Sequence, residues 1–142
     1  MEKYSIEKCV CEDAVDLFDL QEGTYWTLNM FHEALKNDRV IFLKAVVDKK
    51  IVGHVALDAV LDEGEIHMVV INPDYRGKGI AKRLVKEAIK LANVKKIFLE
   101  VDETNEKAIN LYKGLGFMPI SKRKQYYGNV SAIIMQTEYK LN

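Results

Sequence analysis

The sequence predicts a single α/β domain, residues 1–142, with a mixed sheet of about seven strands flanked by about four helices. Three observations predict it. Short apolar runs recur along the chain, separated by turn residues. A strong helical periodicity follows a glycine-rich turn at residues 75–81, with Ala81, Leu84 and Ala88 on one face. A length of 142 residues suits one compact core, and neither a repeat nor a linker divides the chain.

The first half of the chain is expected to supply one strand, two short helices and then three strands. The second helix has Thr24 or Thr27 as a possible N-cap. A hairpin turn is expected at residues 48–50, between two β-rich runs. The expected elements are strand 4–10, helices 13–20 and 27–36, and strands 40–47, 51–61 and 65–71.

The second half alternates helices with strands and then ends on a hairpin. The helix after the glycine turn is the most strongly periodic element, and a helix ending near Gly114 and Gly116 follows a short buried strand. A right-handed crossover through each helix would make its two strands parallel neighbours. The expected elements are helix 81–92, strand 96–101, helix 106–113, and strands 117–126 and 131–139.

Composition excludes several classes of partner. The chain has 21 basic and 21 acidic residues, so a broad nucleic-acid or anionic-membrane surface is not expected. No apolar leader or run of membrane-spanning length is present, which predicts a cytoplasmic protein. Cys9 and Cys11 form an isolated C-x-C that suits neither a disulfide framework nor zinc, so no metal is expected. We expect a monomer or a weak dimer.

The turn Tyr75-Arg76-Gly77-Lys78-Gly79-Ile80-Ala81 lies between an apolar strand and the periodic helix. The N–H groups of a first helical turn have no partner inside the helix, and the helix dipole adds partial positive charge there. Two glycines allow the backbone to bend and a ligand to approach it closely. This arrangement predicts a site for a phosphate-bearing ligand.

A second motif downstream makes the turn more specific. Arg76, Gly79 and Ala81 fit a pattern of arginine, two residues, glycine, one residue, and glycine or alanine. With Asn105, Ala108-Ile109-Asn110-Leu111-Tyr112 and Leu115-Gly116-Phe117, this turn resembles the GCN5-related N-acetyltransferase superfamily. The segments that look most like its RimI-type ribosomal-protein and N-terminal acetyltransferases are Leu99-Glu100-Val101, Tyr126-Tyr127 and Ala132-Ile133-Ile134-Met135.

The resemblance implies acetyl-CoA as the donor and an α/β fold whose strands splay at the cofactor. In that family the strand before the turn ends in a β-bulge, which corresponds here to Val69, Val70 and Ile71, and the N–H of Val70 would meet the thioester oxygen. Asn105 would cap its helix, contact the pantetheine arm, or do both. The residues implied to bind the cofactor are Val69, Val70, Ile71, Arg76, Gly77, Lys78, Gly79, Ile80, Ala81, Lys82, Asn105 and Tyr112.

Three residues are candidates for proton transfer. The resemblance implies Tyr112 as the general acid for the departing thiolate and Glu100 as the base. The alternative for Tyr112 is a tyrosine that only packs in the core, and the alternative for Glu100 is a solvated strand residue. A carboxylate inside an apolar strand has its pKa raised if it is buried, which would suit a base. Glu65 is the rival base because other branches of the family use the strand before the turn.

The acceptor is expected to be a primary amine, and most strongly the N-terminal α-amine of a protein, with a ribosomal protein as one candidate. The resemblance implies that Tyr25, Tyr126 and Tyr127 would line its slot. A small amine such as a polyamine, amino acid or antibiotic is the alternative acceptor. A catalytically silent acyl-CoA-binding module is the alternative from another class. The sequence leaves open N-terminal against lysine acetylation, and direct against water-mediated action of Glu100.

Overall fold

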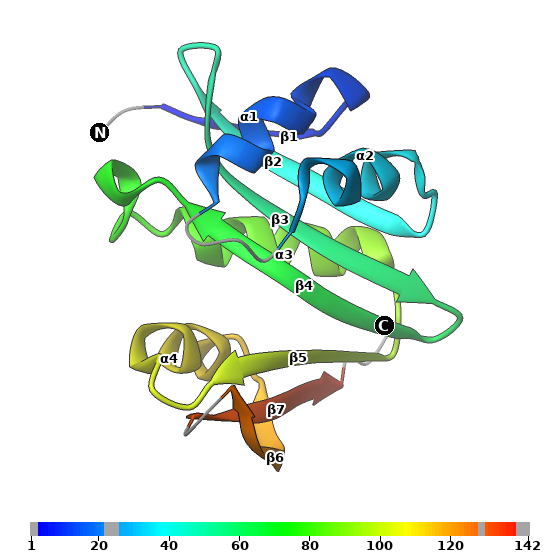
Figure 1. Ribbon diagram of the computed structural model, residues 1–142, viewed down its shortest axis with the longest axis vertical. Helices are drawn as coiled ribbons and strands as arrows, with labels where there is room; N and C mark the ends of the chain where they lie inside the picture. The colour runs from blue at the N-terminus through cyan, green and yellow to red at the C-terminus, as the bar shows by residue number, and fades with distance from the viewer. Residues whose placement is uncertain (1–2, 22–25, 128–129, 139–142) are drawn as a thin grey trace.

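The computed structural model describes residues 3–21, 26–127 and 130–138, which form one seven-stranded sheet with helices on its faces (Figure 1). The strand order is β1-β2-β3-β4-β5-β7-β6. Strands β4 and β5 are parallel, and every other neighbouring pair is antiparallel. The predicted fold class, a mixed sheet of seven strands with four α-helices, is confirmed.

Every predicted strand and α-helix has a counterpart, with ends displaced by a few residues. Two short 3-10 turns, η1 and η2, were not predicted. The elements are β1 (Ser5–Lys8), η1 (Cys11–Asp13), α1 (Ala14–Leu20), α2 (Leu28–Lys36), β2 (Val40–Val47), β3 (Lys50–Val60), β4 (Glu63–Ile71), η2 (Pro73–Tyr75), α3 (Ile80–Ala92), β5 (Lys96–Asp102), α4 (Glu106–Gly114), β6 (Met118–Tyr127) and β7 (Val130–Glu138).

Local chemistry explains several of these boundaries. Helix α2 begins after Thr27, whose side chain accepts a hydrogen bond from the N–H of Met30 at 3.2 Å. The β2–β3 hairpin turns through Asp48 and Lys49, both with positive φ, as a two-residue turn compatible with the strand twist requires. Helix α3 ends where Asn93 adopts the left-handed conformation.

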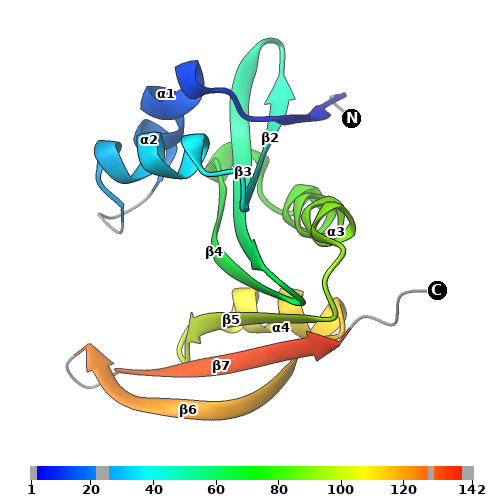
Figure 2. The same ribbon diagram turned by 90° about the vertical axis from the view of Figure 1, so that its right-hand side faces the viewer.

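Two apolar clusters cover opposite faces of the sheet. Ala56 of β3 belongs to the cluster under α1 and α2, whereas its neighbours Val55 and Leu57 belong to the cluster under α3 and α4. Alternation along a strand produces this division. Figure 2 shows α1 and α2 on one side of strands β2 to β4, and α3 on the other. We refer to the two sides as the α1–α2 face and the α3–α4 face.

The expectation that each later helix joins parallel neighbours is correct for α3 and wrong for α4. Helix α3 joins β4 and β5, which pair in parallel. Helix α4 joins β5 and β6, but β7 lies between these two strands and pairs antiparallel with both. The final hairpin inserts its second strand beside β5. This long-range pairing buries Met135 and Thr137 of β7.

Candidate active site

The parallel strands at the centre of the sheet part halfway along their length (Figure 2). Strands β4 and β5 pair only from Glu63↔Lys96 to Ile66↔Leu99. Beyond that last pair, β4 continues to Ile71 against β3, and β5 continues to Asp102 against β7. We call the space between residues 67–71 of β4 and residues 100–102 of β5 the β4–β5 opening.

Backbone hydrogen-bonding groups line both edges of this opening. The N–H of Asn72 donates to the carbonyl of Val52 on β3 at 2.8 Å. Because these groups alternate along a strand, the N–H of Val70 also faces β3, whereas those of Val69 and Ile71 face the opening. The prediction that the N–H of Val70 faces a ligand there is therefore wrong, because the N–H groups that face the opening are those of its two neighbours.

The facing edge of β5 obeys the same alternation. The N–H of Glu103 donates to the carbonyl of Ser131 on β7 at 3.0 Å, so the backbone groups of Glu100 and Asp102 face the opening. An extended ligand that carries amide groups can hydrogen-bond to strand edges of this kind as an added strand.

The β-bulge lies earlier in β4 than the resemblance implies. Residues 69–71 pair regularly with β3, and the extra residue is His67, because Ile66 is opposite Leu57 and Met68 is opposite Ala56. The bulge reverses which face each side chain occupies. Ile66 can then pack on the α3–α4 face while Met68, two residues later, packs under α1 and α2.

The glycine turn adjoins the end of β4. Gly77 and Gly79 have φ of 78° and 81°, and Gly79 is the N-cap of α3. A Cβ placed on either glycine would have no protein atom within 4 Å, so the space beside each is open. The Nε of Arg76 donates to the carbonyl of Ile71 at 3.2 Å, which joins the turn to the strand.

The glycine turn and the first helical turn of α3 together fit a diphosphate. Helix α3 has 13 residues, and its first intrahelical bond in this region runs from the N–H of Arg83 to the carbonyl of Gly79 at 3.2 Å. The preceding N–H groups, at residues 80–82, point out of the helix end. The Lys78 ammonium lies 5.2 Å from the centre of the Tyr75 ring, at the same end.

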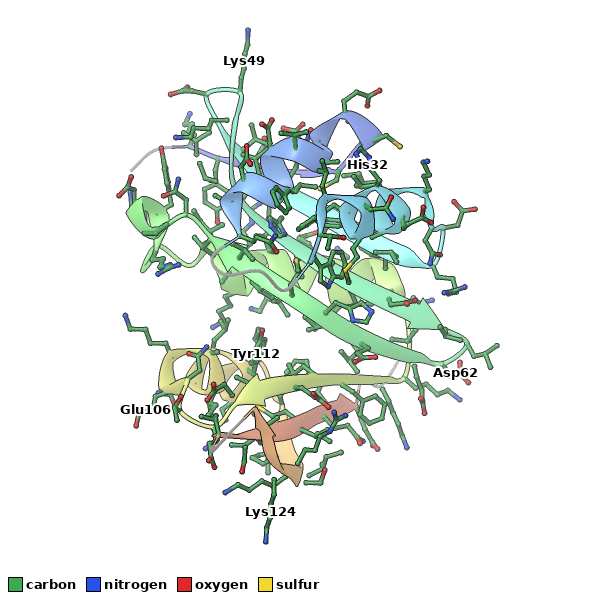
Figure 3. The ribbon with its side chains drawn as sticks, viewed as in Figure 1. His32, Lys49, Asp62, Glu106, Tyr112 and Lys124 are labelled. Carbon is green, nitrogen blue, oxygen red and sulfur yellow. The ribbon has the colours of Figure 1, made fainter. Side chains whose placement is uncertain are left out.

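Tyr112 occupies the inner side of α4. Asn105 caps this helix, and its Oδ1 accepts a hydrogen bond from the N–H of Ala108 at 3.2 Å. Tyr112 packs edge-on against Phe117 at 5.6 Å, and Figure 3 shows its side chain extending from α4 toward β4. Burial raises the pKa of Tyr112 to about 12. Its phenol is therefore a protonated donor at neutral pH.

Glu100 is exposed, as the alternative of a solvated strand residue anticipated. Leu99 and Val101 on either side of it are buried on the α3–α4 face, and alternation turns Glu100 to the opposite face. Its Oε1 lies 2.7 Å from Nη2 of Arg123, a residue on β6 that no sequence motif singled out. No local pattern could have identified Arg123, because its proximity depends on the insertion of β7.

Glu65 and His67 lie on the same face as Glu100. Glu65 is exposed and stands opposite Phe98, within the paired part of β4. His67 is the first residue of β4 beyond the last β4–β5 pair, and Glu100 is the first residue of β5 beyond it. These two residues therefore flank the mouth of the opening. The Nε2 of His67 lies 3.7 Å from Oδ2 of Asp58.

Aromatic side chains form one wall beside His67. The Trp26 ring lies 6.1 Å from His67 and 5.1 Å from Phe31 of α2. Gln21 holds the backbone of Trp26 on both sides, donating to its carbonyl at 2.7 Å and accepting from its N–H at 3.4 Å. Of the three predicted acceptor residues, Tyr25 lies outside the described residues. Tyr126 and Tyr127 belong to β6, but their side chains lie outside the described part.

Metal-ligating clusters and membrane-spanning helices are both absent from residues 3–21, 26–127 and 130–138. No group of three or more His, Cys, Asp or Glu side chains there could hold a metal ion. Within the same ranges, no helix combines the length and the apolar character needed to span a membrane.

Comparison with known proteins agrees with this geometry. Residues 7–117 match the Acetyltransferase (GNAT) family. The [Ribosomal protein bS18]-alanine N-acetyltransferase of Haemophilus influenzae is 31% identical over 144 residues, which cover 92% of this chain and 93% of that protein.

Two solved structures share the fold. The ribosomal-protein-S18-alanine N-acetyltransferase of Escherichia coli superimposes with a TM-score of 0.91 at 24% identity, covering 99% of this chain and 96% of that one. The PaiA N-acetyltransferase of Thermoplasma acidophilum, solved in complex with coenzyme A, has a TM-score of 0.82 at 20% identity. That match covers 96% of this chain and 99% of the other.

Proposed function

The chain belongs to the acetyltransferase (GNAT) family and is an N-acetyltransferase, and we propose that its acceptor is the N-terminal α-amine of a protein. Ribosomal protein bS18 is the first acceptor to test, because relatives similar along nearly their whole length are named for it. The single structural observation that supports the proposal is the β4–β5 opening, which lies beside the glycine turn and carries Glu100 at its mouth.

Acetyl-CoA is the acetyl donor of this family, and when bound it supplies a thioester whose carbonyl carbon an amine can attack. The N–H groups at residues 77–82 would hold its diphosphate, with Arg76 keeping the turn on β4. Val69 and Ile71 on one edge, and Asn105 at the start of α4, would hold the pantetheine arm. An N–H of Val69 or Ile71 would donate to the carbonyl oxygen as negative charge develops on it.

Two side chains would move the protons. Glu100 would accept a proton from the acceptor amine, directly or through water, and Tyr112 would donate one to the departing thiolate. An N-terminal amine has a pKa near 7.7–8.0, against about 10.4 for lysine. Because an α-amine gives up its proton more readily than a lysine side chain, it requires less of a general base.

Glu100 and Glu65 are distinguished by neutralising each in turn. Glu100→Gln is expected to lower kcat by about 100-fold or more, because general-base catalysis contributes roughly 10²–10⁴-fold. Glu65→Gln is expected to stay within a few-fold of wild type, because Glu65 lies inside the paired region of β4 and β5. Steady-state kinetics at saturating acetyl-CoA measure both, and the reverse order would make Glu65 the base.

Gly79 tests the glycine turn. Gly79→Ala would place an L-residue at φ 81°, which costs about 1–2 kcal/mol, and its methyl group would occupy the space proposed for the diphosphate. We expect a lower melting temperature and roughly 10-fold weaker coenzyme A binding by calorimetry.

Gly114→Ala is the matched control for Gly79→Ala. A Cβ added at Gly114 would also have no protein atom within 4 Å, but Gly114 lies at the end of α4 without a positive φ. This variant should keep both stability and coenzyme A binding. Unchanged binding in Gly79→Ala would contradict the placement of the diphosphate.

The proposal is tested by thiol release from acetyl-CoA with three sets of acceptors. The first set is short peptides with free N-termini, one of which carries the bS18 N-terminal sequence. The second set is peptides with a blocked N-terminus and a free lysine, and the third is polyamines. Turnover confined to free N-termini is the expected result. Turnover confined to lysine peptides or to polyamines would overturn the proposed acceptor and leave the enzyme class standing. Mass spectrometry of the product peptide locates the acetyl group.

A further inference from the structure

An ion pair joins the outermost strand of the sheet to the mouth of the β4–β5 opening. The Nη2 of Arg123 on β6 lies 2.7 Å from Oε1 of Glu100 on β5. Strand β7 lies between these two strands. Across the sheet, Arg123 of β6 is opposite Ala132 of β7, which is opposite Asp102 of β5. Glu100 is opposite Ile134 of β7. Arg123 therefore reaches diagonally over β7 to hold a carboxylate two positions along β5.

The position that Arg123 holds is the one the proposed reaction uses. Glu100 is the first residue of β5 beyond the last β4–β5 pair, and its backbone groups also face the opening. A carboxylate has two oxygens, so Oε1 can accept from the guanidinium while Oε2 accepts a proton. A glutamate on a half-exposed strand face would otherwise distribute among several rotamers.

We propose that Arg123 is a positioning residue for acetyl transfer: it fixes the Glu100 carboxylate so that one oxygen points to the acceptor amine. This inference rests on the proposed function, in which Glu100 is the base. The guanidinium has five donors in a rigid fork, so it fixes a carboxylate more closely than an ammonium does.

The effect of the pair on the reaction is one of position. The two side chains are 47% and 36% exposed, so solvent screens the attraction between their charges. Misplacing a catalytic group by about 1 Å can cost as much as 100-fold in rate. Removal of Arg123 should therefore slow the reaction by releasing the carboxylate.

A second ion pair of the same length provides the control. Lys122, the residue before Arg123, has its Nζ 2.7 Å from Oε2 of Glu103. Hydrogen bonds from Lys122 and from the N–H of Ser131 lower the pKa of Glu103. This pair fastens the turn after β5, and neither residue is in the proposed machinery.

The experiment measures kcat and KM for Arg123→Gln, Arg123→Lys and Lys122→Gln with the best acceptor peptide. Arg123→Gln is expected to lower kcat about 10-fold with an unchanged KM for acetyl-CoA. Arg123→Lys should recover part of that loss, and Lys122→Gln should match wild type. Thermal unfolding checks that the Arg123 variants remain folded, which an exposed pair allows.

The Glu100→Gln background separates positioning from a structural effect. If Arg123 acts through Glu100, adding Arg123→Gln to Glu100→Gln should cost no further activity. A full additional 10-fold loss in that background would overturn the inference, as would wild-type kcat in Arg123→Gln alone. Wild-type activity in Glu100→Gln would overturn the base assignment and this inference together. A large loss in Glu100→Gln beside an unaffected Arg123→Gln would overturn this inference alone.

Discussion

Replacing Tyr112 by phenylalanine is expected to lower kcat by about 10²–10⁴-fold while coenzyme A binding is retained. The change removes only the phenolic oxygen. The ring keeps its edge-on packing against Phe117, and the side chain, 8% exposed in wild type, stays in the core under α4. The loss would therefore report the missing proton donor. Stopped-flow measurement of thiol release at saturating peptide gives kcat directly.

The pH dependence of the wild-type enzyme gives a second test of Tyr112. Burial raises the pKa of Tyr112 to about 12, so the phenol keeps its proton across the usual assay range. The rate should show no alkaline decline from loss of this proton below about pH 11.

Tyr4→Phe is the control for Tyr112→Phe, because Tyr4 lies at the far edge of the sheet, with the Arg83 guanidinium 5.3 Å from its ring centre. Equal activity of Tyr112→Phe and Tyr4→Phe would rule out Tyr112 as the acid.

The sequence predicted most reliably those features that local chemistry determines. The periodicity from Ala81 onward defined helix α3, and the glycine turn before it lies where the motif requires, with Gly79 in the left-handed conformation. Asn105 caps α4, and Thr27 caps α2. Each of these depends on a few adjacent residues, so a pattern in the sequence can identify it.

The features that the sequence mispredicted depend on contacts between distant segments. The bulge at His67 allows Ile66 to be buried on the α3–α4 face and Met68 to pack, half-buried, under α1 and α2. The backbone direction of Val70 follows from that register. Glu100 has an apolar sequence context, yet its side chain is exposed on the side of β5 opposite the α3–α4 face, beside a hairpin whose register the sequence does not reveal.

A fully buried histidine, His54 of β3, packs on the α1–α2 face. His54 is fully buried between Phe31 and Phe42, and neither ring nitrogen makes a well-formed hydrogen bond within the described part of the chain. Burial lowers the pKa of His54 to about 4, and the backbone of Leu17, the smaller of the two causes, acts in the opposite direction. The folded protein thus holds a neutral imidazole where the unfolded chain would bind a proton near its ordinary pKa of 6.5.

The stability of the fold is therefore expected to fall as pH decreases from 6.5 to 4. In this window the unfolded state binds more protons than the folded state, so the contribution of His54 is fully present above pH 6.5 and is lost toward pH 4. The loss from this residue amounts to about 3 kcal/mol, at 1.36 kcal/mol for each unit of pKa shift. Urea unfolding at several pH values measures it.

His54→Leu removes the titrating ring while keeping an apolar side chain under α1 and α2, so it should flatten the stability curve between pH 4 and 6.5. His32→Gln, on α2, is the control: it retains His54 and should keep the wild-type slope. An equal slope in all three proteins would mean that His54 does not carry the acid sensitivity. A flattened curve in His54→Leu alone would assign the acid sensitivity to His54, whose ring packs against Phe31 and Phe42.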